Sequence, residues 1–370
     1  MNTQGHYVRR NRHRRTLTAC LVCAGITAAS LPAQAAAYRV EGLWARGAAT
    51  ALNDAGEVVG WETGGSLATW TPTGGLKLAP VTYSADTPWG ISDAGLIGGT
   101  SSRYLSTSPD FGYRTGDKGF LWDLETSLPA SDQENAPFGL LGMAISDVSP
   151  AGHVVGTTSS HEAFVRYNGT TTFLGGLSSA AAVNSLGYVV GHSATLDGPF
   201  LWTPDDGMQA IGPFGPQTFV ASFPTDINDE GVVIGVGDLD GCYCGVVWRD
   251  GLGVQGIGYL ASEWQSSYPY AINNAGYAVG RSAVSDGVSH AFIWHAGTAM
   301  QDLNDLIDPS SGWALETAYA INNRGQIVGQ GRYQGSEYAY LLSPVPEPAH
   351  WMMMLGGLTL MGFMSRKRKP

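Results

Sequence analysis

The sequence predicts an all-β fold, a seven-bladed β-propeller of four-stranded blades, and three observations support this. One short turn motif recurs seven times, and an aromatic-rich segment follows each copy. The last repeat also lacks a final segment that the start of the mature chain supplies. With 370 residues, 51 Gly and 14% charged residues, the chain has the composition of a turn-rich globular protein.

The turn motif joins two short apolar segments through Asn, Asp, Ser and Gly, as in "AINNAGYAVG" at residue 271. These residues tolerate positive φ, so each copy predicts a hairpin between the first two strands of a blade. The turn glycines are about 45 residues apart, as expected of propeller blades. They are Gly56, Gly95, Gly152, Gly187, Gly231, Gly276 and Gly325.

The second turn position has one oxygen-bearing side chain and no alternating carboxylate partner, which favours hairpin chemistry over a calcium loop. We take this position to be Asp54, Asp93, Asp147, Ser185, Asp229, Asn274 and Asn323.

The third segment of most repeats ends in an aromatic residue, and its regular position suits packing between blades. We therefore expect five tryptophans to lie in the core: Trp70, Trp122, Trp202, Trp248 and Trp294. A short turn leads to a fourth strand, except in the seventh repeat. "YRVEGL", Tyr38 to Leu43, stands where that missing strand would be, so we expect the mature N-terminus to close the ring. An open solenoid would need capping units instead.

The links between strands two and three, and between successive blades, are long and irregular. Because strand direction alternates, these links emerge on one face, which we call the variable-loop face. Aromatic rings there suit stacking on sugars, whereas the alternative is that they only fill blade edges. The candidate ligand residues are Trp61, Trp89, Tyr113, Trp264, Tyr268 and Trp313.

Both ends of the chain carry targeting patterns. Residues 1–37 predict a secretory signal peptide, with five arginines before an apolar run and Ala33-Gln34-Ala35 as a small-x-small cleavage site. Residues 345–370 begin with a box, Val345, Pro346, Glu347 and Pro348, and continue into an uncharged apolar run. This run predicts a short membrane-spanning helix, with a basic tail that stays cytoplasmic. The tail is Arg366, Lys367, Arg368 and Lys369.

The order of box, span and basic tail resembles the PEP-CTERM sorting signal of Gram-negative bacteria. The resemblance implies processing by an exosortase-type enzyme and transient anchoring in the inner membrane. It also implies delivery to the cell surface or the exopolysaccharide matrix. It implies nothing about the activity of residues 38–344.

The repeats themselves resemble the bacterial extracellular HAF repeat family, which is named for a His-Ala-Phe run at the third strand. His290-Ala291-Phe292 matches outright, and "HEAF" at His161 matches with one inserted residue. The family carries no established catalytic residues that could be transferred to this chain.

Residues 38–344 carry 11 Lys and Arg against 30 Asp and Glu, a net charge of −19. The summed field repels phosphate, so nucleic acid and anionic membranes are excluded as partners, while cations and neutral glycans stay open.

Motifs for catalysis, cofactors and metals are scarce. The chain has no Gly-x-Ser-x-Gly, no His-Glu-x-x-His and no nucleotide-binding loop, so we name no catalytic residue and no cofactor. Asp238-Leu239-Asp240-Gly241 resembles half of a calcium loop, but it lacks the third ligand and the distal Glu, which favours a solvated turn. For Cys242 and Cys244, free thiols, a labile disulfide and metal capture all stay open.

The sequence therefore predicts an exported, non-enzymatic binding or adhesion module whose partner is a polysaccharide or a surface protein. The rival is a carbohydrate-active enzyme, a glycoside hydrolase or lyase, on the same scaffold. Carboxylates that converge in the central channel with shifted pKa would favour the enzyme. An aromatic platform without them would favour binding.

Overall fold

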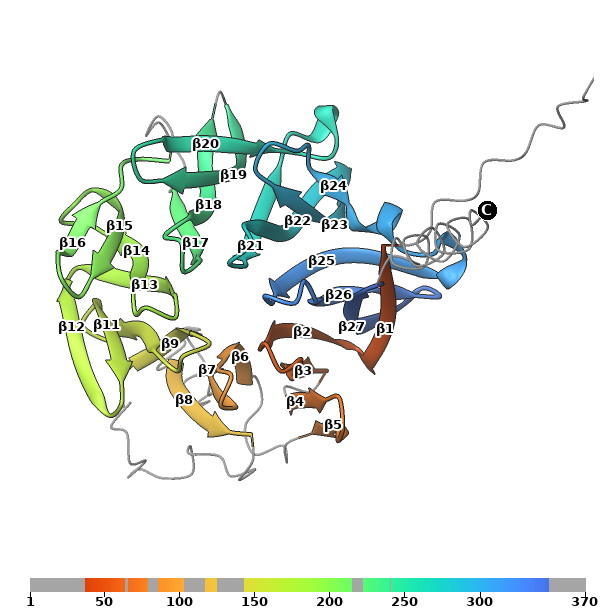
Figure 1. Cartoon of the computed structure of the whole chain (residues 1–370), viewed down its shortest axis with the longest axis horizontal. Helices are drawn as coiled ribbons and strands as arrows, with labels where there is room; N and C mark the ends of the chain where they lie inside the picture. The colour runs from red at the N-terminus through yellow and green to blue at the C-terminus, as the bar shows by residue number, and fades with distance from the viewer. Residues whose placement is uncertain are drawn as a thin grey trace, which may run out of the picture. The chain divides into compact units, whose positions relative to one another are not determined.

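The computed structural model describes residues 37–63, 66–78, 86–102, 117–124, 143–214, 222–239 and 241–345. In this part of the chain, seven antiparallel sheets are arranged in a ring (Figure 1). Six sheets have four strands and the second has three, since residues 125–142, where its fourth strand is expected, lie outside the described residues. The prediction of a seven-bladed all-β propeller is confirmed.

The blades follow the order of the chain from the innermost strand outward. Blade 1 is β2 (Gly47–Leu52), β3 (Val58–Glu62), β4 (Ser66–Thr71) and β5 (Gly75–Leu78). Blade 2 is β6 (Asp86–Ile91), β7 (Leu96–Ser102) and β8 (Asp117–Asp123). Blade 3 is β9 (Met143–Val148), β10 (Val154–Thr158), β11 (Glu162–Tyr167) and β12 (Thr170–Gly176). Blade 4 is β13 (Ser178–Val183), β14 (Val189–Ser193), β15 (Gly198–Thr203) and β16 (Gly207–Ala210). Blade 5 is β17 (Phe223–Ile227), β18 (Val233–Leu239), β19 (Cys242–Arg249) and β20 (Gly253–Gly258).

Blade 6 is β21 (Ser267–Ile272), β22 (Tyr277–Ser285), β23 (Val288–His295) and β24 (Gln301–Asp302). Blade 7 is β25 (Trp313–Ile321), β26 (Ile327–Tyr333), β27 (Ser336–Pro344) and β1 (Tyr38–Ala45). Three short 3₁₀ helices occupy links between strands, namely η1 (Ser262–Trp264), η2 (Leu303–Leu306) and η3 (Pro309–Ser311).

The ring is closed by the strand that the sequence predicted. β1 pairs antiparallel with β27, so that Tyr38 lies opposite Pro344 and Glu41 opposite Leu341. Trp44 near the end of β1 is buried, and its indole N–H donates to the Trp61 carbonyl of blade 1 at 3.0 Å. One strand from the N-terminus therefore completes blade 7 and also contacts the next blade.

The hydrophobic core consists of seven clusters in the described residues, one at each interface between neighbouring blades. The predicted core tryptophans fit this arrangement. Trp294 is 7% exposed, and Trp70, Trp202 and Trp248 pack against the clusters while partly buried. The side chain of Trp122 lies outside the described residues.

The innermost strand of every blade carries a β-bulge at the same repeat position. The bulged residues are Thr50, Trp89, Ser146, Ala181, Thr225, Tyr270 and Tyr319. The bulge pushes a carbonyl toward the second strand, where every repeat has a glycine. A Cβ at Gly191 would overlap the Ser179 carbonyl, and the same holds at Gly60, Gly99, Gly156, Gly235, Gly280 and Gly329. The last glycine of each motif copy is therefore required by the bulge.

Aromatic rings cover these glycines. On the third strand Phe292, the Phe of the His-Ala-Phe run, lies opposite Gly280 and is fully buried. Phe120, Phe164, Phe200 and Tyr340 occupy the equivalent position. Blades 1 and 5 have the smaller Ala68 and Val246 there, and the covering rings come from Trp44 and Phe214 instead. The aromatic third strand is thus explained by packing on glycine.

The turn motif also joins the blades to one another. The Asn228 side chain accepts the backbone N–H of Val232 within its own hairpin, and its amide N–H donates to the Asn273 carbonyl of the next blade at 3.0 Å. The same pair of bonds recurs at Asn53, Asn184, Asn273 and Asn322, whose amides reach the next blade. Asn322 donates to the Asn53 carbonyl, which links the last repeat to the first.

The ends of the chain add little to the described fold. The described residues include no helix with the length and apolar character needed to cross a membrane. Val345 is exposed, and its backbone N–H donates to the Ala37 carbonyl. The signal peptide through residue 36, the rest of the sorting box, the apolar run and the basic tail lie outside the described residues.

We predict that Gly191→Ala lowers the free energy of unfolding by about 1–3 kcal/mol, because overpacking against fixed backbone costs that much. Urea denaturation of both proteins measures the difference. Gly176→Ala is the control, since a Cβ there meets nothing within 4 Å. Equal stability of the two variants would show that the bulge does not require glycine.

Candidate functional site

The inner strands enclose a channel of about 400 Å³, lined by residues of all seven blades. Every bulged residue lines it, and so does the residue that follows each bulge. Five of these following residues are small, namely Ala51, Gly90, Ala182, Ala271 and Ala320. The other two are Asp147 and Asp226, so this level of the channel wall carries carboxylates at blades 3 and 5.

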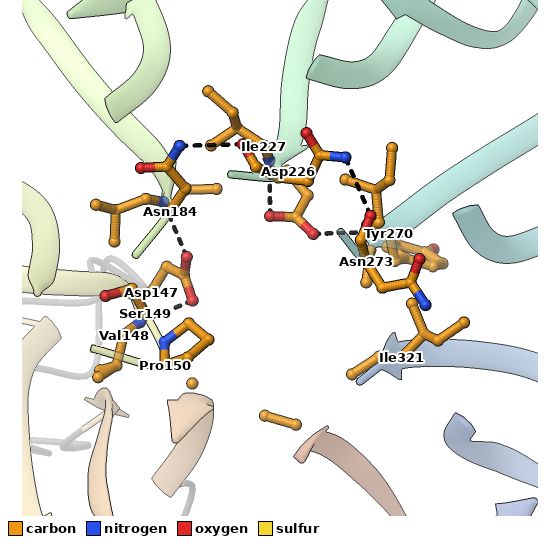
Figure 2. Close-up of a pocket in the computed structure, with 18 of the residues that line it drawn as sticks. Asp147, Val148, Ser149, Pro150, Asn184, Asp226, Ile227, Tyr270, Asn273 and Ile321 are labelled. Atoms are coloured by element: carbon orange, nitrogen blue, oxygen red, sulfur yellow. Dashed lines mark hydrogen bonds between the residues drawn. The ribbon is translucent and has the colours of Figure 1, made fainter. Parts of the chain in front are cut away.

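Both aspartates turn their carboxylates toward the channel, and all four oxygens accept backbone N–H groups (Figure 2). Asp147 accepts from Val148 of its own strand at 2.7 Å and from Val183 of blade 4 at 3.0 Å. Asp226 accepts from Ile227 at 2.7 Å and from Ile272 of blade 6 at 2.8 Å. Each carboxylate therefore bridges two neighbouring blades.

The placement of Asp147 corrects the sequence prediction, which put it at the second position of the hairpin turn. That position is occupied by Pro150, and Asp147 lies on β9, where it faces the channel. Blade 3 has Ser149 in place of the usual turn Asn, and the Ser149 hydroxyl accepts only from His153 within the hairpin. Asp147 supplies the bond to the next blade that Asn supplies elsewhere.

The environment of these carboxylates disfavours their charged form. Both side chains are recessed in the channel wall and only partly accessible. Burial raises the pKa of Asp147 to about 6, although the N–H bonds from Val183 and Val148 oppose the shift. Burial also raises the pKa of Asp226 well above its ordinary value, and the negative charge of Asp147 adds to this effect.

Blades 5 to 7 place aromatic rings and one cation at the channel edge. We call Tyr243, Tyr268, Tyr270, Tyr319 and Arg281 the Tyr–Arg cluster. Tyr270 and Tyr319 line the channel with ring centroids 5.4 Å apart. Tyr268 lies two residues nearer the variable-loop face and makes an edge contact with Tyr243 at 5.5 Å. The Arg281 guanidinium lies over the Tyr268 ring, 5.2 Å from its centroid.

The six candidate ligand residues do not form one surface. Tyr268 belongs to the Tyr–Arg cluster, and Trp264 in η1 is 39% exposed. Trp89 is not on a loop but lines the channel on β6, and it is 48% exposed. Trp61 near the end of β3 is partly buried. Tyr113 lies outside the described residues.

Trp313 packs against other aromatic rings, which the sequence analysis gave as the alternative to sugar binding. It starts β25 and contacts Tyr333, Tyr338 and Tyr340 with centroid distances of 5.3, 6.0 and 6.2 Å. It also packs against the core between blades 6 and 7. Trp313 is partly buried, and these contacts give it a packing role.

The structure describes part of the calcium-like segment at residues 238–241 and both cysteines of the Cys242/Cys244 pair. The carboxylate of Asp238 accepts the Gly241 N–H, as in a turn, while Asp240 lies outside the described residues. Among the described side chains, no group of three or more His, Cys, Asp or Glu could hold a metal ion. The buried Cys242 and Cys244 are paired as a disulfide, which is one of the open alternatives.

Sequence reasoning missed Asp147 and Asp226 as channel residues. It also missed Tyr243 and Arg281 as neighbours of Tyr268, and Tyr319 as a neighbour of Tyr270. A signal for the aspartates was present, because the other repeats have Ala or Gly at that position. No comparable signal marks the Tyr–Arg cluster, since its members come from three blades.

Comparisons with known proteins support the fold alone. No protein-family model matches the chain, and no curated protein matches it. The structure of virginiamycin B lyase from Staphylococcus aureus is similar, with a TM-score of 0.50 and 9% identity over 83% of this chain and 100% of that one. The structure of YCF48 bound to D1 peptide also has a TM-score of 0.50 and 9% identity, over 84% of this chain and 96% of that one.

We predict that the Asp147 carboxylate makes the fold less stable as the pH rises. Its pKa is higher in the folded than in the unfolded chain, so its stabilising contribution is complete below pH 3.8 and is lost by about pH 6. The loss amounts to about 3 kcal/mol. Asp147→Ala introduces the residue of four other blades, so wild type should gain stability relative to this variant between pH 7.5 and pH 4. Urea denaturation at both pH values tests this, and a stability difference that does not change with pH would contradict it.

Proposed function

We propose that this chain is an exported surface or matrix protein that binds a polysaccharide on the variable-loop face without cleaving it. The observation that carries the proposal is the Tyr–Arg cluster, which gathers four phenol rings and a guanidinium beside the channel. Phenol rings stack on the C–H faces of sugars and donate O–H groups to their hydroxyls. A rigid propeller holds the rings in place, so little conformational entropy is lost on binding.

The export part of the proposal rests on the sequence. The signal-peptide pattern before Tyr38 and the box, apolar run and basic tail after Pro344 resemble the segments of proteins that an exosortase-type system sorts. We propose that the protein is anchored transiently in the inner membrane of a Gram-negative bacterium and then reaches the cell surface or the exopolysaccharide matrix. The net charge of −19 on residues 38–344 fits an extracellular partner that is not nucleic acid.

A carbohydrate-active enzyme is the second candidate, and the two channel carboxylates are the observation that favours it. A carboxyl group with a raised pKa suits a general acid, and the negative charge of Asp147 contributes to the raised pKa of Asp226. Against this candidate, every oxygen of both groups accepts an N–H of the inner strands. This bonding gives the pair a structural explanation, and for that reason we prefer binding.

The names of the structural neighbours do not decide between these candidates. One neighbour is named a lyase and the other is bound to a peptide, and each is 9% identical to this chain. A peptide ligand is therefore the alternative partner if no glycan binds.

We predict that Tyr268→Ala weakens binding of exopolysaccharide from the producing organism about three- to tenfold. One aromatic contact contributes about 0.5–1.5 kcal/mol, and 1.4 kcal/mol corresponds to a factor of ten. Calorimetric titration of the full chain in mild detergent, with and without calcium, measures the affinity, while an assay for reducing ends measures cleavage. The control is Tyr277→Ala, an exposed tyrosine of the same blade that starts β22 at the opposite, turn-bearing face.

Saturable binding without release of reducing ends, weakened by Tyr268→Ala and not by Tyr277→Ala, is the expected result. Release of reducing ends by the wild-type protein would instead show that the protein is a carbohydrate-active enzyme. Absence of binding would direct the search to a peptide partner.

A further inference from the structure

Arg281 is an exposed cation without a carboxylate partner among the described residues of a strongly acidic body. Arg39 pairs with Glu41, and Arg332 pairs with Glu316 at 2.7 Å. In the described part of the chain, no carboxylate lies within 4.0 Å of the Arg281 guanidinium, which rests on the Tyr268 ring. The body carries 30 acidic residues against 11 basic ones, and what distinguishes Arg281 from its other arginines is its position over a tyrosine ring of the variable-loop face.

The strand pairing holds Arg281 in this position. Arg281 on β22 lies directly opposite Tyr268 on β21, so the guanidinium covers the ring of its cross-strand neighbour. Tyr243 of blade 5 also makes an edge contact with the Tyr268 ring. Strand pairing and the ring contact therefore hold the guanidinium near Tyr268, and Arg281 is exposed.

The charge of Arg281 also reaches the channel. Burial raises the pKa of Tyr270 and of Tyr319, and the positive charge of Arg281 opposes the increase at both. The two phenols are half-buried beside the guanidinium and keep their protons at neutral pH. The cation thus has neighbouring O–H donors, while the acidic part of the channel is formed by blades 3 and 5.

We propose that Arg281 and Tyr268 form a subsite for the carboxylate of an acidic sugar, a uronate, within the polysaccharide bound by the variable-loop face. The subsite rests on the proposed function and specifies which class of sugar the protein binds. A guanidinium presents two parallel N–H groups that match a carboxylate, and the adjoining phenol ring stacks on the pyranose of the same residue.

The acidic body restricts the kind of polymer that fits. A chain with a carboxylate on every sugar is repelled by the surrounding charge, because neighbouring carboxylates lie within a Debye length of about 8 Å. A chain in which each uronate is flanked by neutral sugars places one charge at Arg281 and none beside it. The subsite therefore selects sparsely charged glycans.

The experiment compares two forms of one probe, a polysaccharide that alternates a uronate with a neutral N-acetyl sugar. One form is intact, and in the other the carboxylates have been reduced to primary alcohols. Affinities of the full chain in mild detergent are measured by calorimetry at low and at moderate salt. Wild type should bind the intact form about tenfold more tightly than the reduced form, and a polymer of uronate alone more weakly than the alternating polymer.

Three variants test the role of Arg281. Arg281→Gln should abolish the preference for the intact form, so that both forms bind with equal affinity, and Arg281→Lys should retain only part of the preference. Arg324→Gln is the matched control, since Arg324 is an exposed arginine in the hairpin turn of blade 7, on the opposite face. Arg324→Gln removes one positive charge, as Arg281→Gln does, but it should keep the preference for the intact form.

The outcomes separate the subsite from the proposed function. Binding of both forms by wild type with equal affinity would overturn the subsite and leave glycan binding intact. Equal losses in Arg281→Gln and Arg324→Gln would also overturn it, because only net charge would then matter. If wild type bound neither form nor the native exopolysaccharide, the proposed function itself would fail.

Discussion

The propeller depends on the side-chain amide of the first turn residue, which makes two hydrogen bonds of different kinds. As an acceptor it completes its own hairpin, and as a donor it reaches the backbone of the next blade, as Asn228 does toward Val232 and Asn273. Only Asn combines an acceptor and a donor at this length, because Asp lacks the N–H and Ser is too short to span the gap. The ring is therefore held by a set of identical, buried, fully satisfied bonds near its axis.

The exceptions support this interpretation. Blades 2 and 3 have Ser92 and Ser149, which complete the hairpin but make no side-chain bond to the next blade in the described structure. The junction of blades 2 and 3 is instead linked by the Asp93 N–H and the Pro150 carbonyl. At the junction of blades 3 and 4, Asp147 accepts the bond from the opposite direction. This substitution has an electrostatic cost, since burial raises the pKa of Asp147 to about 6.

The bulged inner strand connects this architecture to the candidate site. Because the bulge displaces one residue per blade into the channel, the seven bulge positions are free of the packing that constrains their neighbours. They vary from Ala181 to Trp89, whereas the glycine opposite each bulge does not vary among the repeats. Tyr270 and Tyr319 occupy two of these positions in neighbouring blades, so the scaffold itself sets the distance between their rings.

The sequence by itself determined the number of blades, the hairpin turns and the strand that closes the ring, because these features are local or repeat with a fixed period. It could also identify Tyr268 as a residue of the variable-loop face. Tertiary structure alone decided that Trp313 packs against the core, that Asp147 faces the channel, and that Arg281 lies over Tyr268 near Tyr319. A channel is formed by one strand from each blade, so its chemistry depends on residues about 45 positions apart in sequence, and no local pattern encodes which of them meet.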